Sequence, residues 1–72
     1  MKRTYKEVAK KILEVLSDNA EHSYGYLESK VNTNWQTIRD HTEYMELFGA
    51  VTISKENRVK ITGFGLKILK KL

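Results

Sequence analysis

The hydrophobic residues of this chain change their spacing at Gly49. Before Gly49 they recur every three or four positions, which is the spacing of an amphipathic helix. Just after Gly49 they alternate with polar residues, as expected of a strand with one buried face, and helical spacing returns after about residue 62. Because neither spacing suits the other kind of element, the pattern predicts a mainly α fold with a small β-hairpin: three helices, the hairpin and a last helix.

Three helices are expected before Gly49, at about residues 4–17, 23–31 and 34–48. Each begins at a residue type that caps helix N-termini with its side-chain oxygen. These residues are Thr4, Ser23 and Asn34. Gly49 stands where a glycine in the left-handed conformation ends a helix. Gly25 weakens the second helix, by roughly 1 kcal/mol relative to alanine.

The hairpin is expected over about residues 50–62 and the last helix over about 63–72. Four inward-facing residues carry the alternation of the hairpin: Val51, Ile53, Val59 and Ile61. The polar stretch 55–58 between them is the predicted tip. Thr62 is placed to cap the last helix, whose inward-facing residues are expected to be Ile68, Leu69 and Leu72.

The chain of 72 residues is expected to form a single domain. It has no cysteine, so neither a disulfide nor a thiolate metal site is expected, and no run of about 18 apolar residues that would cross a membrane. It also lacks a glycine-rich phosphate loop and residues at metal-ligand spacing. We therefore expect a cytoplasmic protein that is not an enzyme, with no metal, cofactor, membrane or evident small-molecule ligand.

The charges are unevenly distributed along the chain. Lysine and arginine exceed aspartate and glutamate by thirteen to nine, which gives +4 and a pI near 9.4. Residues 1–16 hold five of these cations and two acids, residues 17–50 hold two cations and six acids, and residues 51–72 hold six cations and one acid. A basic balance of this kind suggests an anionic partner, and any function must also account for the acidic middle.

Five short motifs follow one another in the order found in a known family. They are Asn34-Trp35-Gln36-Thr37-Ile38-Arg39, Met45, Phe48-Gly49-Ala50-Val51, Arg58-Val59-Lys60-Ile61-Thr62 and Gly65. On these motifs the sequence resembles winged helix-turn-helix DNA-binding domains, and most closely the small archaeal winged-helix transcriptional regulators and chromatin-type proteins. The resemblance covers about residues 4–72 and implies a three-helix core, a two-stranded wing and a C-terminal helix.

Three features depart from the family pattern. Thr42 stands where the inner face of the third helix usually has leucine, and Gly63 and Phe64 replace a charged pair before Gly65. The third helix is also acidic, because Arg39 is outnumbered by three carboxylates: Asp40, Glu43 and Glu46.

The resemblance implies that the first turn of the third helix enters the major groove of DNA. Asn34, Gln36 and Thr37 are then expected at base edges or phosphates, and Gln36 can bond adenine through two hydrogen bonds. The alternative is that Asn34 only caps the helix while the other two face water. Trp35 is expected to pack against the second helix, with stacking on a sugar-phosphate as its alternative.

Arg39 and His41 are expected on or beside the same outward arc, where Arg39 suits a phosphate or guanine. The alternative for Arg39 is an ion pair with Glu43, four residues on, worth a few tenths of a kcal/mol. The wing is expected to lie on the minor groove or the adjacent backbone, and its candidate contacts are Lys55, Asn57, Arg58 and Lys60. Its alternative is a solvated loop.

The basic ends have two interpretations. Lys2, Arg3 and Lys6 are expected to form an arm on the DNA backbone. The last three lysines do the same or simply solvate the last helix: Lys67, Lys70 and Lys71.

A homodimer is expected through the first and last helices, with two third helices about 34 Å apart. Its candidate interface residues are Tyr5, Phe64, Leu66 and Leu72. The alternative is that Phe64 packs beneath the wing as core.

The sequence thus predicts sequence-preferring binding of double-stranded DNA by a transcriptional regulator or chromatin-associated protein, associated with the nucleoid. The alternative from another class is a protein–protein interaction module that keeps the winged-helix scaffold without binding DNA. The acidic third helix and Phe64 favour that alternative. RNA binding is a third option, which has weaker support because no aromatic platform on a sheet is apparent.

Overall fold

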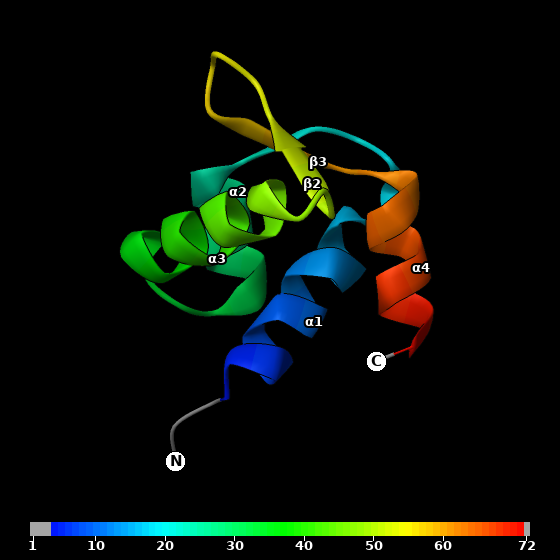
Figure 1. Cartoon of the computed structure of the whole chain (residues 1–72). Helices are drawn as coiled ribbons and strands as arrows, with labels where there is room; N and C mark the ends of the chain where they lie inside the picture. The colour runs from blue at the N-terminus through cyan, green and yellow to red at the C-terminus, as the bar shows by residue number, and fades with distance from the viewer. Residues whose placement is uncertain (1–3, 72) are drawn as a thin grey trace.

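The computed structural model describes residues 4–71, which form four helices, a short 3-10 turn and three strands (Figure 1). Their order is α1 (Tyr5–Val15), η1 (Leu16–Asp18), β1 (His22–Ser23), α2 (Tyr24–Val31), α3 (Trp35–Leu47), β2 (Val51–Ile53), β3 (Arg58–Ile61) and α4 (Gly63–Lys71). The predicted fold class, a mainly α winged helix-turn-helix with a C-terminal helix, is confirmed. No helix within residues 4–71 is long and apolar enough to cross a membrane.

The three predicted N-caps are present. Thr4 Oγ1 accepts a hydrogen bond from the N–H of Glu7 at 3.1 Å, and Ser23 Oγ accepts from Tyr26 N–H at 3.2 Å. Asn34 Oδ1 accepts at 2.8 Å from the N–H of the third residue of α3. These bonds satisfy N–H groups that the first turn of a helix leaves free, so the three helices begin where the sequence predicts.

Gly49 ends α3 in the predicted left-handed conformation, with φ of 87°. Its N–H donates to the carbonyl of Glu46 at 3.1 Å, and Ala50 N–H donates to the carbonyl of Met45 at 2.9 Å. This pair of bonds is a Schellman motif, which turns the chain sharply out of the helix and into β2.

The sheet has three strands rather than the predicted two. Its order is β1-β3-β2, with antiparallel pairing of His22 with Val59 and of Val51 with Ile61. The prediction missed β1 because a strand of two residues is too short to show alternation. The sheet therefore ties the segment before α2 to the wing.

The core lies where the three helices meet the inner face of the sheet. Its largest fully buried apolar residues are Ile12, Leu13, Leu16, Leu27, Val31, Ile38, Met45, Val51 and Val59. Of the inward-facing residues predicted on the hairpin and the last helix, Val51, Val59 and Ile61 are buried, Ile53, Ile68 and Leu69 are partly buried, and Leu72 is outside the described residues. Thr42, the polar residue on the inner face of α3, is fully buried. Its hydroxyl donates to the carbonyl of Ile38 at 2.8 Å, so its burial leaves no unpaired donor.

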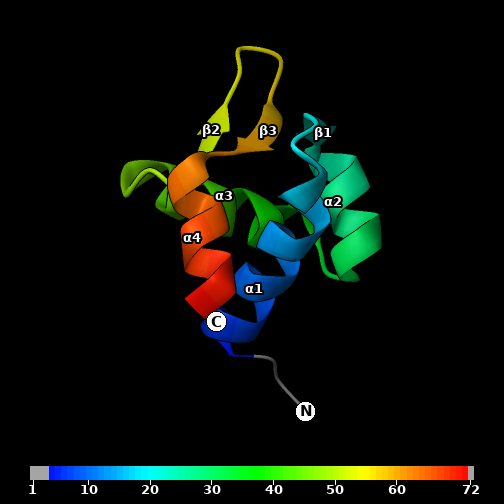
Figure 2. The same ribbon diagram turned by 90° about the vertical axis from the view of Figure 1, so that its right-hand side faces the viewer.

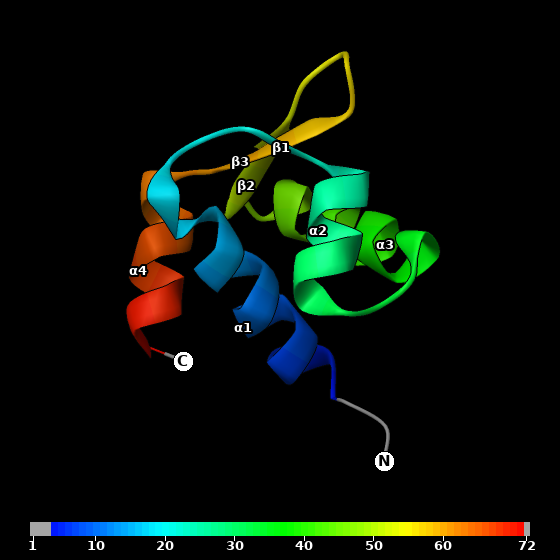
Figure 3. The ribbon, with the colours of Figure 1, turned by 180° about the vertical axis from the view of Figure 1, so that it is seen from behind.

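The helix α4 packs against α1, so α1 lies between α3 and α4 (Figures 1 and 3). Figure 2 shows α4 beside α1, at the base of the sheet. Thr62 caps α4 as predicted, because its Oγ1 accepts from Gly65 N–H at 3.0 Å. A Cβ on Gly65 would collide with the carbonyl oxygen of Ala50, the residue before β2, so only glycine allows the first turn of α4 to lie this close to the sheet.

Candidate nucleic-acid interface

The first turn of α3 is exposed and well ordered by its cap. Asn34 uses its Oδ1 in the cap, as one alternative for this residue predicted, while its amide NH2 takes no part in that bond. Gln36 is exposed and Thr37 is half-buried. The N-terminus of a 13-residue helix concentrates free N–H groups and the positive end of the helix dipole here, which favours an anion.

Trp35 lies between α2 and solvent. Its ring meets the buried Tyr24 of α2 edge-to-face, with centroids 5.9 Å apart, and it remains 46% exposed. The guanidinium of Arg39 lies over the same ring at 5.5 Å. Trp35 therefore packs on α2 as predicted and still offers an indole edge to solvent.

Arg39 is held in place by two weak contacts. Besides the cation–π contact with Trp35, its Nε donates to Glu43 Oε2 at 3.3 Å. The two side chains are 49% and 53% exposed, so the pair contributes about 0.5 kcal/mol or less. Because both contacts are weak, the guanidinium can leave them at little energetic cost. It can then form a stronger bidentate hydrogen bond to another acceptor.

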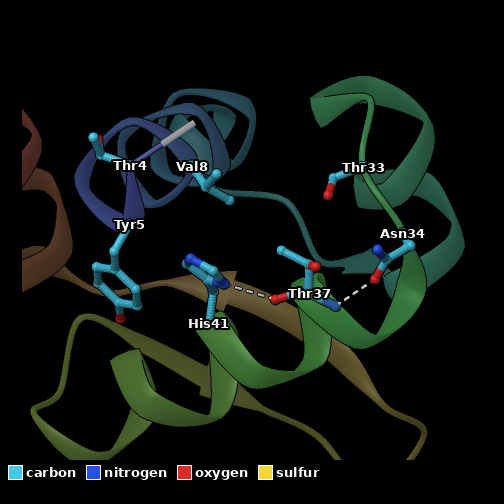
Figure 4. A pocket seen from close by; sticks show the side chains of 7 residues that line it. All are labelled: Thr4, Tyr5, Val8, Thr33, Asn34, Thr37 and His41. Atoms are coloured by element: carbon cyan, nitrogen blue, oxygen red, sulfur yellow. Dashed lines mark hydrogen bonds between the residues drawn. The ribbon is translucent and has the colours of Figure 1, made fainter. Parts of the chain in front are cut away.

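His41 faces away from Arg39, contrary to the prediction that the two share an arc. Its ring stacks on Tyr5 of α1 with centroids 4.4 Å apart, and its Nδ1 donates to the carbonyl of Thr37 at 2.8 Å (Figure 4). Residues two apart on a helix point in nearly opposite directions, about 200° apart, which explains the error. The Nε2 of this ring is buried without a hydrogen-bond partner within residues 4–71.

A hollow of about 580 Å³ separates the start of α1 from the first turn of α3. Figure 4 shows its lining: Thr4, Tyr5, Val8, Thr33, Asn34, Thr37 and His41. Burial against α3 raises the pKa of Tyr5, and the neighbouring Tyr44 raises it further. Tyr5 thus remains neutral at physiological pH and serves as a packing partner for α3.

The wing carries the predicted cations on its exposed surface. A turn from Ser54 to Asn57 forms its tip, closed by Asn57 N–H donating to the Ser54 carbonyl at 3.0 Å, and Asn57 adopts a left-handed φ of 61°. Lys55 is exposed at the tip. Arg58 and Lys60 alternate with the buried Val59 on β3, so both side chains leave the sheet on its outer face.

Glu46 joins the wing to α3, which the sequence did not predict. Its Oε2 accepts a hydrogen bond from the N–H of Ile53 at 3.2 Å. Because β2 is an edge strand, this bond covers an N–H that the sheet leaves free. The last turn of α3 therefore lies against the wing, and Arg39 lies two helical turns before Glu46 on the same side of the helix.

The cationic segments fall into two groups. The tip of the wing lies on the side of the molecule nearer α3, away from α4 (Figures 1 and 3). The lysines of α4 lie beyond α1, so they share no face with the first turn of α3. Of the predicted N-terminal arm, Lys2 and Arg3 are outside the described residues and Lys6 is exposed on α1. The tip of the wing and α3 therefore lie on one side of the molecule, and α4 lies on the other side of α1.

The predicted dimer surface is only partly exposed. Phe64 is 52% exposed, and Tyr5 is half-exposed but packed on His41 and Tyr44. Leu66 is partly buried against the core, and Leu72 is outside the described residues. Phe64 does not pack beneath the wing as core. A two-fold dimer through α1 and α4 stays a prediction.

A second charged cluster precedes α2 and belongs to the fold. The N–H of Ala20 and the ring of His22 both bond the Asp18 carboxylate, the latter at 3.0 Å, and together they lower the pKa of Asp18. His22 in turn stacks on Tyr26 with centroids 4.2 Å apart. Within residues 4–71, no three histidine, aspartate or glutamate side chains gather closely enough to hold a metal ion.

Comparison with known proteins supports the fold. No family model matches the sequence, and no curated protein sequence matches it. Among solved structures, the chain is similar to a MarR family transcriptional regulator from Silicibacter pomeroyi DSS-3, with a TM-score of 0.81 and 20% sequence identity. The similarity covers 90% of this chain and 48% of the other, so this chain spans about half the length of that regulator. This similarity shows the winged-helix fold, while the narrower resemblance to archaeal regulators stays a prediction.

Proposed function

We propose that this winged-helix chain binds double-stranded DNA through the first turn of α3 and the wing, as a transcriptional regulator or chromatin-associated protein in the cytoplasm. The observation that supports the proposal is the bond from Ile53 N–H to Glu46, which holds the last turn of α3 against the wing on the side of the helix that also carries Arg39. A helix and a cationic hairpin on one face match the two contacts of a winged helix with a duplex. The similar solved protein is itself named a transcriptional regulator.

The wing supplies affinity in this proposal. Lys55, Arg58 and Lys60 are exposed, and none of them forms an ion pair within residues 4–71. Each phosphate that such a cation neutralises releases a counterion, which makes binding fall by about 0.9 log units per contact for each log unit of salt. Asn57 holds the tip in a left-handed turn and so fixes the direction of these side chains.

The helix supplies sequence preference. Gln36 can form two hydrogen bonds to adenine, and Arg39 can do so to guanine once it leaves Glu43. Thr37 and the amide NH2 of Asn34 are expected on the flanking phosphate.

The acidic charge of α3 is less unfavourable for DNA than its sequence suggests. Glu43 is paired with Arg39, and Glu46 is engaged by β2 beside the wing. Only Asp40, among the three acids of the helix, has no hydrogen bond or ion pair recorded for its side chain within residues 4–71. The helix can therefore approach a groove with one unpaired carboxylate on its outer face.

A salt titration tests the proposal. Fluorescence anisotropy with a labelled random-sequence duplex gives the slope of log affinity against log salt for the wild type, for Arg58→Ala/Lys60→Ala and for Lys70→Ala/Lys71→Ala. The wing variant should lose about 1.8 from the magnitude of the slope, because two phosphate contacts are removed. The α4 variant should keep the wild-type slope. Equal slopes for the wild type and the wing variant would remove the wing from the interface.

A protein–protein interaction module is the second candidate function. Three large side chains at the end of α3 favour it, because they are exposed and apolar: Tyr44, Leu47 and Phe48. If the wild type gives no anisotropy change with duplex at low salt and micromolar protein, this second function is supported and the first is refuted.

A further inference from the structure

The second half of α3 presents an apolar ridge to solvent. Tyr44, Leu47 and Phe48 are 56%, 83% and 44% exposed, and the rings of Tyr44 and Phe48 meet edge-to-face at 5.7 Å. At about 200 Å² for a large side chain, the three expose roughly 350 Å², within the range of the largest apolar patch on a monomer. We call these three residues the α3 ridge. The proposed DNA face uses the first turn of α3 and leaves the ridge unoccupied.

The outer side of α4 carries an apolar groove of about 360 Å³. Its lining is Phe64, Lys67, Ile68, Lys70 and Lys71. The apolar part comes from Phe64 and Ile68, while three lysines surround it. We call this feature the α4 groove. The proposed DNA face does not use it either, because α4 lies beyond α1 from α3.

The two surfaces have opposite charge. Asp40 precedes Tyr44 by one turn of α3 and Glu43 precedes Leu47 by one turn, so both carboxylates are neighbours of the ridge on the helix surface. Among the described residues, the charged ones that line the groove are all lysines. Two α4 grooves facing each other would oppose three lysines with three lysines, which disfavours a two-fold contact between α4 helices.

We propose that the α3 ridge of one copy docks in the α4 groove of a second copy of this chain. Apolar side chains then meet an apolar floor, and the carboxylates beside the ridge meet the lysines of the rim. The contact uses the carboxylates beside the ridge and the lysines of α4, which the proposed DNA face does not use. The first turn of α3 and the wing stay free, so associated copies keep their DNA-binding faces.

The size of the ridge sets the strength of this contact. An apolar patch of roughly 350 Å² with a charged rim is smaller than the about 800 Å² per partner of a stable complex, so association is transient. Opposite charges at the rim should make it weaken as salt rises. Sedimentation velocity of the full chain without DNA, at protein concentrations up to about 100 μM, can measure such a weak self-association.

Charge reversal on each surface provides the test. The ridge variant is Asp40→Lys/Glu43→Lys, and the groove variant is Lys67→Glu/Lys70→Glu. Each variant alone should associate at least about tenfold more weakly than the wild type, because like charges then meet at the rim. An equimolar mixture of the two should associate again. Lys10→Glu/Lys11→Glu, on exposed positions of α1, is the control and should behave as the wild type.

Several results would overturn the proposal. The first is that the wild type stays monomeric over the whole concentration range. The second is that the groove variant by itself associates as strongly as the wild type. The third is that both variants are monomeric and their equimolar mixture is monomeric too. Circular dichroism spectra and melting temperatures of the variants check that each is folded. Because the measurement contains no DNA, its failure leaves the proposed DNA binding unaffected.

Discussion

Replacing Gly65 by alanine should destabilise the protein through a single steric contact. The added Cβ would overlap the carbonyl oxygen of Ala50 and would also crowd Ile61 Cγ1 at 2.8 Å. Ala50 and Ile61 are both buried in the core. The Ala50 carbonyl also accepts a hydrogen bond from Thr62 N–H at 3.0 Å, so it cannot rotate away without breaking that bond. Overpacking costs about 1–3 kcal/mol, and a clash with the backbone belongs to the upper half of that range. Subtracting the about 1 kcal/mol that alanine gains in helix propensity leaves a net cost of about 1–2 kcal/mol.

The neighbouring Gly63 supplies the matched control. It lies in the same helix turn, but nothing comes within 4 Å of an added Cβ and its φ is not positive. Gly63→Ala should therefore leave the free energy of unfolding unchanged or raise it by about 0.5 kcal/mol. A domain of this size shifts its melting temperature by roughly 4–8 °C per kcal/mol.

Thermal unfolding followed by circular dichroism decides the matter. Gly65→Ala should melt roughly 5–15 °C below the wild type, whereas Gly63→Ala should melt at or above it. If both variants melt together, the close approach of α4 to β2 does not determine stability and the packing described for α4 is wrong.

Three further predictions concern single side chains. Asn34→Ala should lower the free energy of unfolding by about 1 kcal/mol, because it removes the cap of α3. Asn34→Asp should keep the stability of the wild type but weaken duplex binding measured by anisotropy, because its charge repels phosphate. Equal stability of Asn34→Ala and the wild type in thermal unfolding would argue against the cap. Glu46→Ala should speed hydrogen exchange of the Ile53 amide, because it removes the acceptor of that amide. Glu46→Gln keeps an acceptor oxygen and should leave the exchange rate unchanged. An unchanged rate in both variants would show that this bond does not connect α3 to the wing. The lowered pKa of Asp18 means that its contribution to stability is present above its ordinary pKa, about 4, and is lost as pH falls through the lower folded value. Asp18→Asn should thus narrow the difference in melting temperature between about pH 6 and about pH 3, and an undiminished difference would contradict this assignment.

Local chemistry made much of this fold predictable. Thr4, Ser23 and Asn34 mark three helix starts because a side-chain oxygen of this kind binds the N–H groups of the next residues. Gly49 marks the end of α3 because a left-handed residue there is nearly always glycine. The change of hydrophobic spacing located the hairpin, since alternation reflects which side of a strand is buried.

The remaining features depend on contacts between distant segments. The strand β1 is recognised only through its pairing with β3, and the bond from Glu46 to Ile53 requires the Schellman turn that brings β2 back beside α3. The direction of His41 was predicted wrongly because the sequence shows no sign that Tyr5 will lie across from it. In the same way, net charge by segment did not reveal that α4 lies away from the tip of the wing.

The central claim is that one face, made by the first turn of α3 and the wing, binds DNA while α4 does not. Amide chemical shifts of the full chain, recorded by NMR during titration with a short duplex, test it residue by residue. The account predicts shifts concentrated in residues 34–40 and 54–60, with residues 63–71 unchanged at the low protein concentration where copies do not associate. Shifts concentrated in α4, with the first turn of α3 and the wing unaffected, would contradict it.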